Sequence, residues 1–399
     1  MSERFLSPAG NGPRSDLPAP DAEARRHSQR LIEAIRSELN RRGGTIPFDR
    51  FMELALYAPG LGYYTAGARK FGAAGDFVTA PEISPVFAHC LARQCQQVLA
   101  GLGAGDLLEF GAGSGKLAAD LLAELEALGQ LPQRYLILEL SAELRGRQQA
   151  TIAARVPQLV GRVQWLEQLP DQGFRGVVLA NELLDAMPVH RFRITNGRVL
   201  EQFVTWRREG FAMLWDTPED QLLETPLTGL ASQRDDYESE INLRAGPWIK
   251  ALGKRFEAGL VLLIDYGYTG LEYYHPQRDR GTLMCHYRHR AHSNPFRYPG
   301  LQDITAHVDF SRLAEAAVEA GFSIDGYATQ AFFLMGCGLD RLVAESDPED
   351  IRAHLALVQG VKRLTLPSEM GERFKVLGLG KGIWEPLIGF GMQDLRQRL

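Results

Sequence analysis

The sequence of 399 residues has few cysteines, no long apolar run and no excess of positive charge. Its four cysteines include no C-x-x-C pair, so they indicate no disulfide framework and favour a reducing compartment. The strongest apolar run, residues 260–264, has the length of a buried strand and is far shorter than a membrane span. Asp and Glu number 49 against 44 Lys and Arg, which gives no general attraction to nucleic acid or to an anionic membrane.

Targeting signals are also lacking in the first 25 residues, which are rich in Pro, Gly and Ser and carry several acids. They contain no apolar stretch typical of a secretory signal, and the acids are not typical of an organelle transit peptide. The sequence therefore predicts a disordered lead-in at residues 1–25 and a soluble, cytoplasmic protein.

From about residue 106 onward, short apolar strands alternate with helical segments. Repeated strand–helix units predict an α/β fold, in which a largely parallel sheet is covered by helices on both faces. The predicted strands lie near residues 106–110, 135–139, 163–166, 177–181, 260–265, 323–329 and 374–379.

Other segments interrupt this alternation and predict added units. Helices are expected in residues 26–57 and 331–366, where they would form a cap, and an antiparallel meander is expected at 190–216 around an Asn-Gly turn. The predicted units are N-terminal helices with a lid loop at 26–100, a core at 101–330 with an insertion at about 190–255, and a helical lobe with the last strand at 331–399.

A glycine-rich turn, Glu-Phe-Gly-Ala-Gly-Ser-Gly at 109–115, joins the first strand of the sheet to its helix. Lys116 breaks the dinucleotide fingerprint, Leu117 breaks the P-loop motif, and Ala112 breaks the nucleophile elbow. The turn is similar to that of class I S-adenosylmethionine methyltransferases, in which an acid such as Glu139 ends the second strand.

This resemblance implies a cofactor site. Gly111, Gly113 and Gly115 would admit the methionine moiety, because missing side chains let a ligand approach the backbone. Glu109 would face its ammonium group, and Glu139 would accept hydrogen bonds from both ribose hydroxyls. A structural helix-entry turn is the alternative for the glycines, and an ordinary surface carboxylate is the alternative for Glu139.

Further motifs, running in order from about residue 45 to 380, resemble those of the MidA-like methyltransferases, the family of the mitochondrial complex I assembly methyltransferase. The resemblance implies a seven-stranded class I sheet with an added helical lobe and a small antiparallel insertion. It also implies S-adenosyl-L-methionine as the donor, a protein arginine as the acceptor, and a suggested role in respiratory complex assembly. A non-catalytic assembly factor and a small-molecule methyltransferase are the alternatives. The motifs lie at residues 70–72, 75–82, 84, 109–115, 181–188, 264–267, 281–283, 303–310 and 370–374.

The irregular stretch at 62–82 is predicted to be a lid over the sulfonium, with Asp76, Thr79 and Glu82 among the cofactor-binding residues. A packed loop without contact to ligand is the alternative.

Asn181, Glu182 and Asp185 follow the fourth strand, at the carboxyl edge where open α/β sheets bind ligands. Carboxylates pair well with a planar guanidinium, so Glu182 and Asp185 are predicted to hold the arginine. The alternative is that Asn181 and Asp185 cap a helix.

His286, His289 and His292 are spaced by three residues, but no carboxylate or cysteine pair completes a zinc set, so no metal site is predicted. His289 is predicted to belong instead to a polar cluster in the acceptor pocket, with a purely structural network as the alternative. That cluster consists of Tyr287, His289, Asp303, Thr305 and His307.

Overall fold

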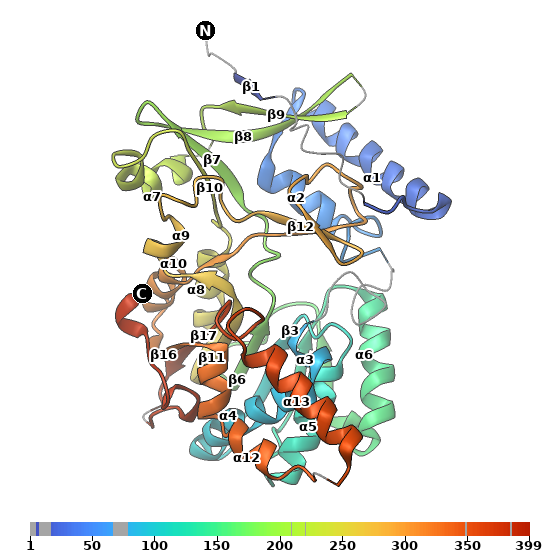
Figure 1. The fold of residues 1–399 in the computed structure, drawn as a ribbon, viewed down its shortest axis with the longest axis vertical. Helices are drawn as coiled ribbons and strands as arrows, with labels where there is room; N and C mark the ends of the chain where they lie inside the picture. The colour runs from blue at the N-terminus through green and yellow to red at the C-terminus, as the bar shows by residue number, and fades with distance from the viewer. Residues whose placement is uncertain are drawn as a thin grey trace.

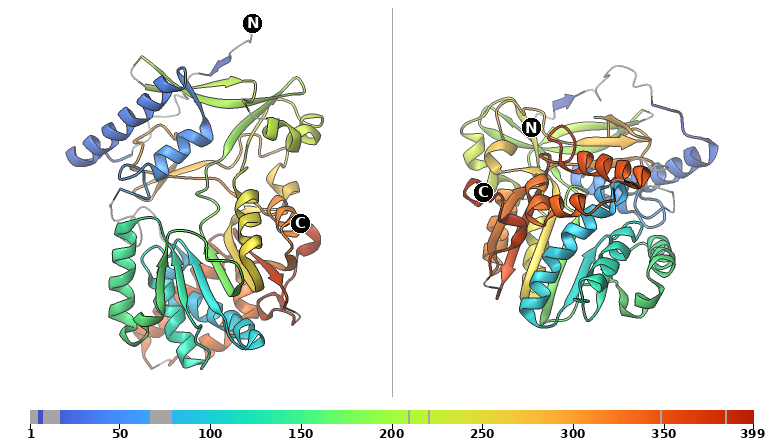
Figure 2. Two further views of the ribbon diagram at one scale, coloured as in Figure 1. Left: turned by 180° about the vertical axis from the view of Figure 1, so that it is seen from behind. Right: turned by 60° about the horizontal axis from the view of Figure 1, so that its bottom comes forward.

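The computed structural model describes residues 5–7, 17–66, 79–208, 210–219, 221–347, 349–383 and 385–399. The chain forms two lobes (Figure 1). The lower lobe is built on the large sheet, and the upper lobe contains the meander and the first helices. Figure 2 shows the same division from behind.

Seven main strands form the sheet of the lower lobe, in the order β16-β17-β11-β6-β3-β4-β5, and the short β15 (Val308–Asp309) pairs beside β11. β17 runs antiparallel to both of its neighbours, and the other main strands run parallel to one another. This arrangement confirms the predicted α/β class and the seven strands. Their bounds are β3 Asp106–Phe110, β4 Tyr135–Leu138, β5 Val163–Leu166, β6 Phe174–Asn181, β11 Phe256–Tyr268, β16 Ser323–Thr329 and β17 Phe374–Lys381.

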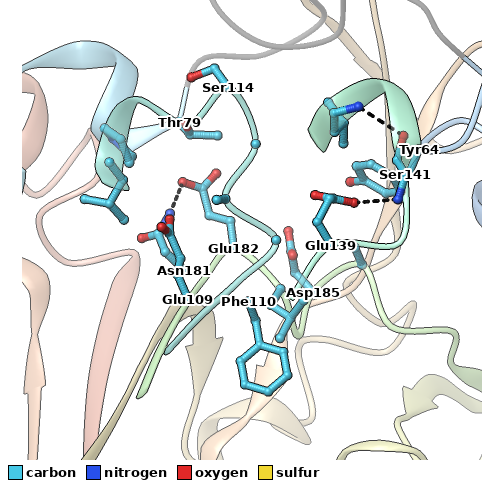
Figure 3. A pocket seen from close by; sticks show the side chains of 18 of the residues that line it. Tyr64, Thr79, Glu109, Phe110, Ser114, Glu139, Ser141, Asn181, Glu182 and Asp185 are labelled. Atoms are coloured by element: carbon cyan, nitrogen blue, oxygen red, sulfur yellow. Dashed lines mark hydrogen bonds between the residues drawn. The ribbon is translucent and has the colours of Figure 1, made fainter. Parts of the chain in front are cut away.

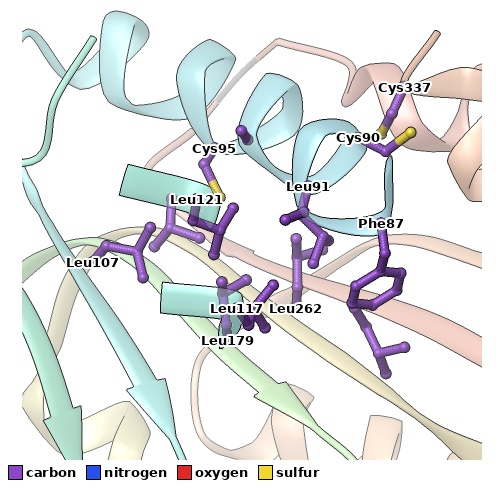
Figure 4. Packing of buried hydrophobic residues seen from close by; sticks show 14 of the residues in the cluster. Phe87, Cys90, Leu91, Cys95, Leu107, Leu117, Leu121, Leu179, Leu262 and Cys337 are labelled. Atoms are coloured by element: carbon purple, nitrogen blue, oxygen red, sulfur yellow. The ribbon is translucent and has the colours of Figure 1, made fainter. Parts of the chain in front are cut away.

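Helices cover both faces of this sheet, because its central strands are buried on both sides. On one face, α4 (Pro85–Leu102) packs Phe87, Leu91 and Cys95 over apolar side chains of β3, β6 and β11 (Figure 4). α5 (Lys116–Ala127) and α6 (Ala142–Arg155) extend that face. On the other face lie α8 (Ala245–Arg255) and α10 (Phe310–Glu319).

The upper lobe is a second sheet in which the meander lies where the sequence predicted it. Asn196 and Gly197 have φ angles of 53° and 70°, as expected for the two-residue hairpin turn that joins β7 to β8. α1 (Ala22–Arg41) and α2 (Phe48–Tyr57) pack with this sheet. Its strands are β1 Phe5–Ser7, β2 Thr45–Pro47, β7 His190–Thr195, β8 Arg198–Arg207, β9 Gly210–Asp216 and β10 Tyr237–Ile241.

A smaller three-stranded sheet lies under α2 in the upper lobe (Figure 1). It consists of β12 (Met284–Tyr287), β13 (Arg290–His292) and β14 (Asp303–Thr305). The remaining short helices are α3 (Ala80–Ile83), α7 (Gln221–Ala231) and α9 (Gly270–Tyr273). Among the helices of the described ranges, none is both long enough and apolar enough to span a membrane.

The division into units differs from the sequence prediction in three places. α11 (Gln330–Gly336), α12 (Leu339–Ala344) and α13 (Ile351–Thr365) form no cap with α1 and α2, because their apolar side chains pack into the α4 face of the large sheet. α4 itself belongs to the core and not to an N-terminal unit. Residues 284–305, predicted as core, supply the small sheet of the upper lobe. An amphipathic period shows which face a helix buries, but not the surface that it meets.

Candidate active site

A cavity of about 260 Å³ lies between the lobes, at the carboxyl ends of the central strands. Its walls come from the glycine turn, from the segments after β4 and β6, and from the upper lobe (Figure 3). The predicted residues that line it are Thr79, Glu82, Glu109, Gly111, Gly113, Glu139, Asn181, Glu182 and Asp185. Asp76 lies outside the described residues.

Two glycines of the turn, Gly113 and Gly115, have different surroundings in the structure. At Gly113, with φ at 52°, an added Cβ atom would meet no described atom within 4 Å, so that position faces open space in the cavity. At Gly115, an added Cβ would lie 2.8 Å from Cα of Gln148. Gly115 is not among the described residues that line the cavity, and it allows α5 and α6 to approach closely, which gives it a packing role; its contact with the cofactor stays a prediction.

Two buried carboxylates, those of Glu109 and Glu139, line the cavity together with the glycine turn. Glu109, which is 4% exposed, accepts a hydrogen bond of 2.6 Å from the Tyr135 hydroxyl, and burial raises its pKa to about 7. Glu139 accepts hydrogen bonds from the backbone N–H of Ser141 at 2.9 Å and from Nε2 of Gln148 at 3.1 Å. Burial also raises the pKa of Glu139. The sequence analysis did not identify Gln148. The only feature of the sequence that could have indicated its role is that a polar residue occupies the buried face of a helix.

The short helix α3 contacts both halves of the cavity. Ser114 of the glycine turn donates a hydrogen bond of 2.5 Å to Oε1 of Glu82. The backbone N–H of Ala80, at the other end of α3, donates to Oε1 of Glu182 at 3.3 Å. The last residues of the predicted lid are therefore tied to the glycine turn and to Glu182 after β6.

The chain after β6 forms turns and no helix before β7 begins, so Asn181 and Asp185 do not cap a helix there. Glu182 has a φ of 51°, an uncommon conformation for a residue with a side chain. Its carboxylate accepts a hydrogen bond of 3.1 Å from Nδ2 of Asn181. Oδ2 of Asp265 accepts from the backbone N–H groups of Leu184 and Asp185 at 2.8 and 3.2 Å, which fixes the turn.

These acids are crowded in a buried place, and this favours their neutral forms. Burial, with Asp265 nearby, raises the pKa of Glu182 to about 8. Burial raises the pKa of Asp185 well above its usual range, with the charges of Asp265 and Asp303 adding to the effect. The pKa of Asp265 rises to about 7, also chiefly through burial. A bound cation would relieve this crowding.

The upper lobe completes the cavity with aromatic rings and a further acid. Tyr64 donates a hydrogen bond of 2.9 Å to Oδ1 of Asp303, which is 3% exposed. The rings of Tyr57 and Tyr64 are stacked at 5.5 Å, and the Tyr57 hydroxyl donates to the backbone oxygen of Ala186 at 3.0 Å. Tyr266, near the end of β11, also lines the cavity. Sequence reasoning missed the role of these three tyrosines, although adjacent tyrosines after α2 and the Ile-Asp-Tyr-Gly motif were visible signals.

The prediction for His289 is wrong, because its side chain is exposed and lies outside the cavity wall. Tyr287 pairs with Arg290 across β12 and β13, so Arg288 and His289 form the hairpin turn with φ angles of 48° and 60°. His286, two residues before the turn, lines the cavity instead.

Of the rest of the predicted polar cluster, Asp303 and Thr305 line the cavity, whereas Tyr287 and His307 do not. Within the described ranges, no group of three or more His, Cys, Asp or Glu side chains could hold a metal ion.

Comparisons with known proteins agree with this arrangement. Residues 90–328 match the model of a family of S-adenosyl-L-methionine-dependent methyltransferases. The mitochondrial protein arginine methyltransferase NDUFAF7 of Danio rerio is 29% identical to this chain. The match covers 83% of this chain and 82% of that protein. The Mus musculus protein of that name is 31% identical and covers 84% of this chain and 81% of its own length.

A solved structure from Burkholderia thailandensis, with S-adenosyl-homocysteine bound, is also similar. It has 44% sequence identity and a TM-score of 0.93, and the match covers 96% of this chain and 100% of that one.

Proposed function

The chain belongs to this family of S-adenosyl-L-methionine-dependent methyltransferases, and we propose that its acceptor is an arginine side chain of a protein. One observation carries the proposal. Glu182 and Asp185 from the lower lobe and Asp303 from the upper lobe line one cavity together with the glycine turn. Several buried acids beside aromatic rings suit a planar cation with many N–H donors.

The donor half of the cavity fits the cofactor. Gly113 leaves open the space that a Cβ atom would occupy. We propose that Glu139, with both oxygens oriented by donors of the chain, binds the ribose hydroxyls, and that Glu109 faces the ammonium group. Thr79 and Glu82 would close the cavity from the side of α3. S-adenosyl-L-methionine supplies, when bound, a methyl group on a positively charged sulfur.

On the acceptor side, the chain positions and polarises the arginine. A guanidinium is a poor nucleophile because its charge is delocalised and its pKa lies above about 12. We propose that Glu182 and Asp185 accept hydrogen bonds from its far nitrogens, so that positive charge concentrates there and electron density returns to the reacting nitrogen. Asn181 orients Glu182, and the stacked Tyr57 and Tyr64 exclude water.

The wider biological role is inferred from relatives. The Danio rerio and Mus musculus relatives are named mitochondrial protein arginine methyltransferases, and this name supports a protein acceptor here. A role in respiratory complex assembly and a cytoplasmic location stay predictions from the sequence, as does the expectation that nucleic acid and membranes are not partners.

The test is transfer of label from tritiated S-adenosyl-L-methionine to an extract of cells that lack this protein, with purified enzyme added. The expected result is a labelled protein band whose hydrolysate contains methylated arginine. The matched control is the enzyme with Glu182→Gln, which should bind the cofactor and leave the band unlabelled. Label confined to small molecules would instead indicate a metabolite methyltransferase, and label on lysine or on carboxylates would refute arginine as the acceptor.

A further inference from the structure

A second, larger cavity of about 770 Å³ lies along the edge of the same sheet, and it is an open groove. Tyr268 at the end of β11, Thr329 at the end of β16 and Lys375 at the start of β17 contribute to its walls. The loop after α9 adds Arg278, and the C-terminal segment adds Arg398. None of the residues proposed for catalysis or for cofactor binding lines this groove.

The groove adjoins the acceptor side of the first cavity through an aromatic wall. Tyr266 lines the first cavity and Tyr268 lines the groove, and side chains two residues apart on a strand point to the same face. The ring of His307 lies beside both, at 6.1 Å from the ring of Tyr266 and 5.1 Å from that of Tyr268. The ring of His307 therefore lies between the tyrosine that lines the first cavity and the tyrosine that lines the groove.

Positive charge gathers at the groove end of this wall. The guanidinium of Arg278 lies 3.9 Å from the centre of the Tyr268 ring, and the ammonium of Lys375 lies 5.9 Å from it. Both donate to backbone oxygens, of Glu272 and Glu372, and in the described part of the chain neither forms an ion pair with a carboxylate.

Besides burial, the positive charges of Arg278 and Lys375 also lower the pKa of His307. With these effects its pKa is lowered to about 4. The carboxylates of Glu272 and Glu372 line the groove as well, but both residues are exposed, so water screens their charge.

We propose that this groove binds an acidic side chain of the polypeptide segment that carries the acceptor arginine. The inference rests on the proposed function, because it requires a protein substrate. Acidic side chains line the first cavity, and Arg278, Lys375 and Arg398 line the groove, so an arginine and a nearby acid would bind in one register only. Tyr266 and Tyr268 are about 7 Å apart along the strand, the length of about two extended residues, so the acid should lie at least two residues from the arginine.

The experiment uses nine-residue peptides with one central arginine among glycine and serine. A neutral reference peptide is compared with a series that carries a single aspartate at each other position in turn. Values of kcat/KM are measured with labelled S-adenosyl-L-methionine for the wild-type enzyme, for Arg278→Gln and for Lys375→Gln. The matched control is Arg352→Gln, which removes an exposed cation of α13 that lines neither cavity.

For the wild-type enzyme, we expect aspartate at one or two positions, two to four residues from the arginine, to raise kcat/KM about tenfold over the reference. Arg278→Gln should remove that gain while leaving the rate with the reference peptide unchanged, and Arg352→Gln should retain the gain. Lys375→Gln provides a second test if thermal melting shows that Arg278→Gln is not folded.

The two proposals fail in distinguishable ways. Equal rates for all peptides with the wild-type enzyme would refute the proposal that the groove binds an acidic side chain, but would not contradict arginine as the acceptor. A gain that persists in both groove variants would also overturn the groove. If no peptide is methylated although calorimetry shows cofactor binding, the proposed arginine acceptor is contradicted and the groove inference falls with it.

Discussion

Replacing Glu182 with glutamine removes one ionisable carboxyl from the proposed acceptor side of the cavity and nearly preserves its shape. The carboxylate accepts hydrogen bonds from the backbone N–H of Ala80 at 3.3 Å and from Nδ2 of Asn181 at 3.1 Å. Both reach Oε1, so the single oxygen of a glutamine amide can accept the same two hydrogen bonds. Its NH₂ group then points where the carboxylate offered a second acceptor.

The size of the expected effect follows from the contacts that are lost. A hydrogen bond to a charged group contributes about 1.5–3 kcal/mol, and a bidentate carboxylate makes two such bonds with a guanidinium. Loss of this pair should therefore cost about 3 kcal/mol or more, which is at least roughly 100-fold in kcat/KM. Cofactor affinity should stay within about threefold, because Glu182 does not contact Glu139 or the glycine turn in the hydrogen bonds of the cavity.

The dependence on pH provides a second measurement with the same variant. With the pKa of Glu182 raised to about 8, only about a tenth of these groups are ionised at pH 7 in the free enzyme. The kcat/KM of the wild-type enzyme should rise about tenfold from pH 7 to pH 9, and Glu182→Gln should lack that rise. A carboxyl with a raised pKa in the folded state loses its stabilising effect as pH increases. The melting temperature of the unliganded wild-type protein should therefore fall relative to Glu182→Gln between about pH 4.5 and pH 8.

The assay combines initial rates on the labelled protein band, calorimetry with S-adenosyl-L-methionine, and thermal melting over this pH range. A variant that binds the cofactor normally and retains the wild-type rate would show that Glu182 does not hold the acceptor. Equal loss of rate and of cofactor affinity would assign the residue to the donor side. Parallel pH profiles for both proteins would place the titrating group elsewhere, with Asp185 the first candidate.

Three further substitutions test other parts of the site. Gly113→Val should abolish cofactor binding in calorimetry, because the new side chain enters open space in the cavity, and it should also lower the melting temperature, because a valine is strained at the φ of 52° found here; normal binding by the folded variant would contradict the assigned role of the turn. Glu139→Ala should weaken binding of S-adenosyl-L-methionine by about tenfold or more, through loss of the hydrogen bonds to the ribose, and unchanged affinity would exclude this contact. Tyr64→Phe frees an oxygen of Asp303 and should raise KM for the acceptor by about five- to tenfold without changing cofactor affinity. A purely structural role for Tyr64 would lower the melting temperature and leave KM unchanged.

The large sheet could be predicted from the sequence because its pattern is local. Runs such as residues 260–264 are apolar at every position, as strands buried on both faces require, and each is separated from the next by a helix. The glycine turn and Glu139 were also predictable, because both lie at fixed places relative to the first two strands.

The acceptor side depends on contacts between distant residues, which no local pattern encodes. Tyr64 and Asp303 are separated by 239 positions and meet in one hydrogen bond. The placement of α11 to α13 against α4 is equally non-local, since several apolar surfaces were available to an amphipathic helix.

Smaller errors have local physical causes. His289 was misplaced because the register of a hairpin decides which residues form its turn, and a shift of one or two positions moves a side chain out of the cavity. For Gly115, the structure shows a packing role that the sequence did not reveal, because spacing alone does not distinguish a glycine required by a ligand from one required by a neighbouring helix.

The connection between the two halves of the site explains why the upper lobe belongs to the enzyme. The glycine turn and Glu139, which are proposed to bind the cofactor, both lie at the edge of the large sheet. The proposed acceptor side includes Asp303 and Tyr64 from the upper lobe, and α3 links the halves through Ser114 on one side and Glu182 on the other. A change in the contact between Ser114 and Glu82 can thus reach the carboxylate proposed to hold the arginine through a helix of four residues. A protein that used the cofactor only as a structural ligand would have no need for buried acids on the opposite side of the cavity, since each is costly to hold there without a cation.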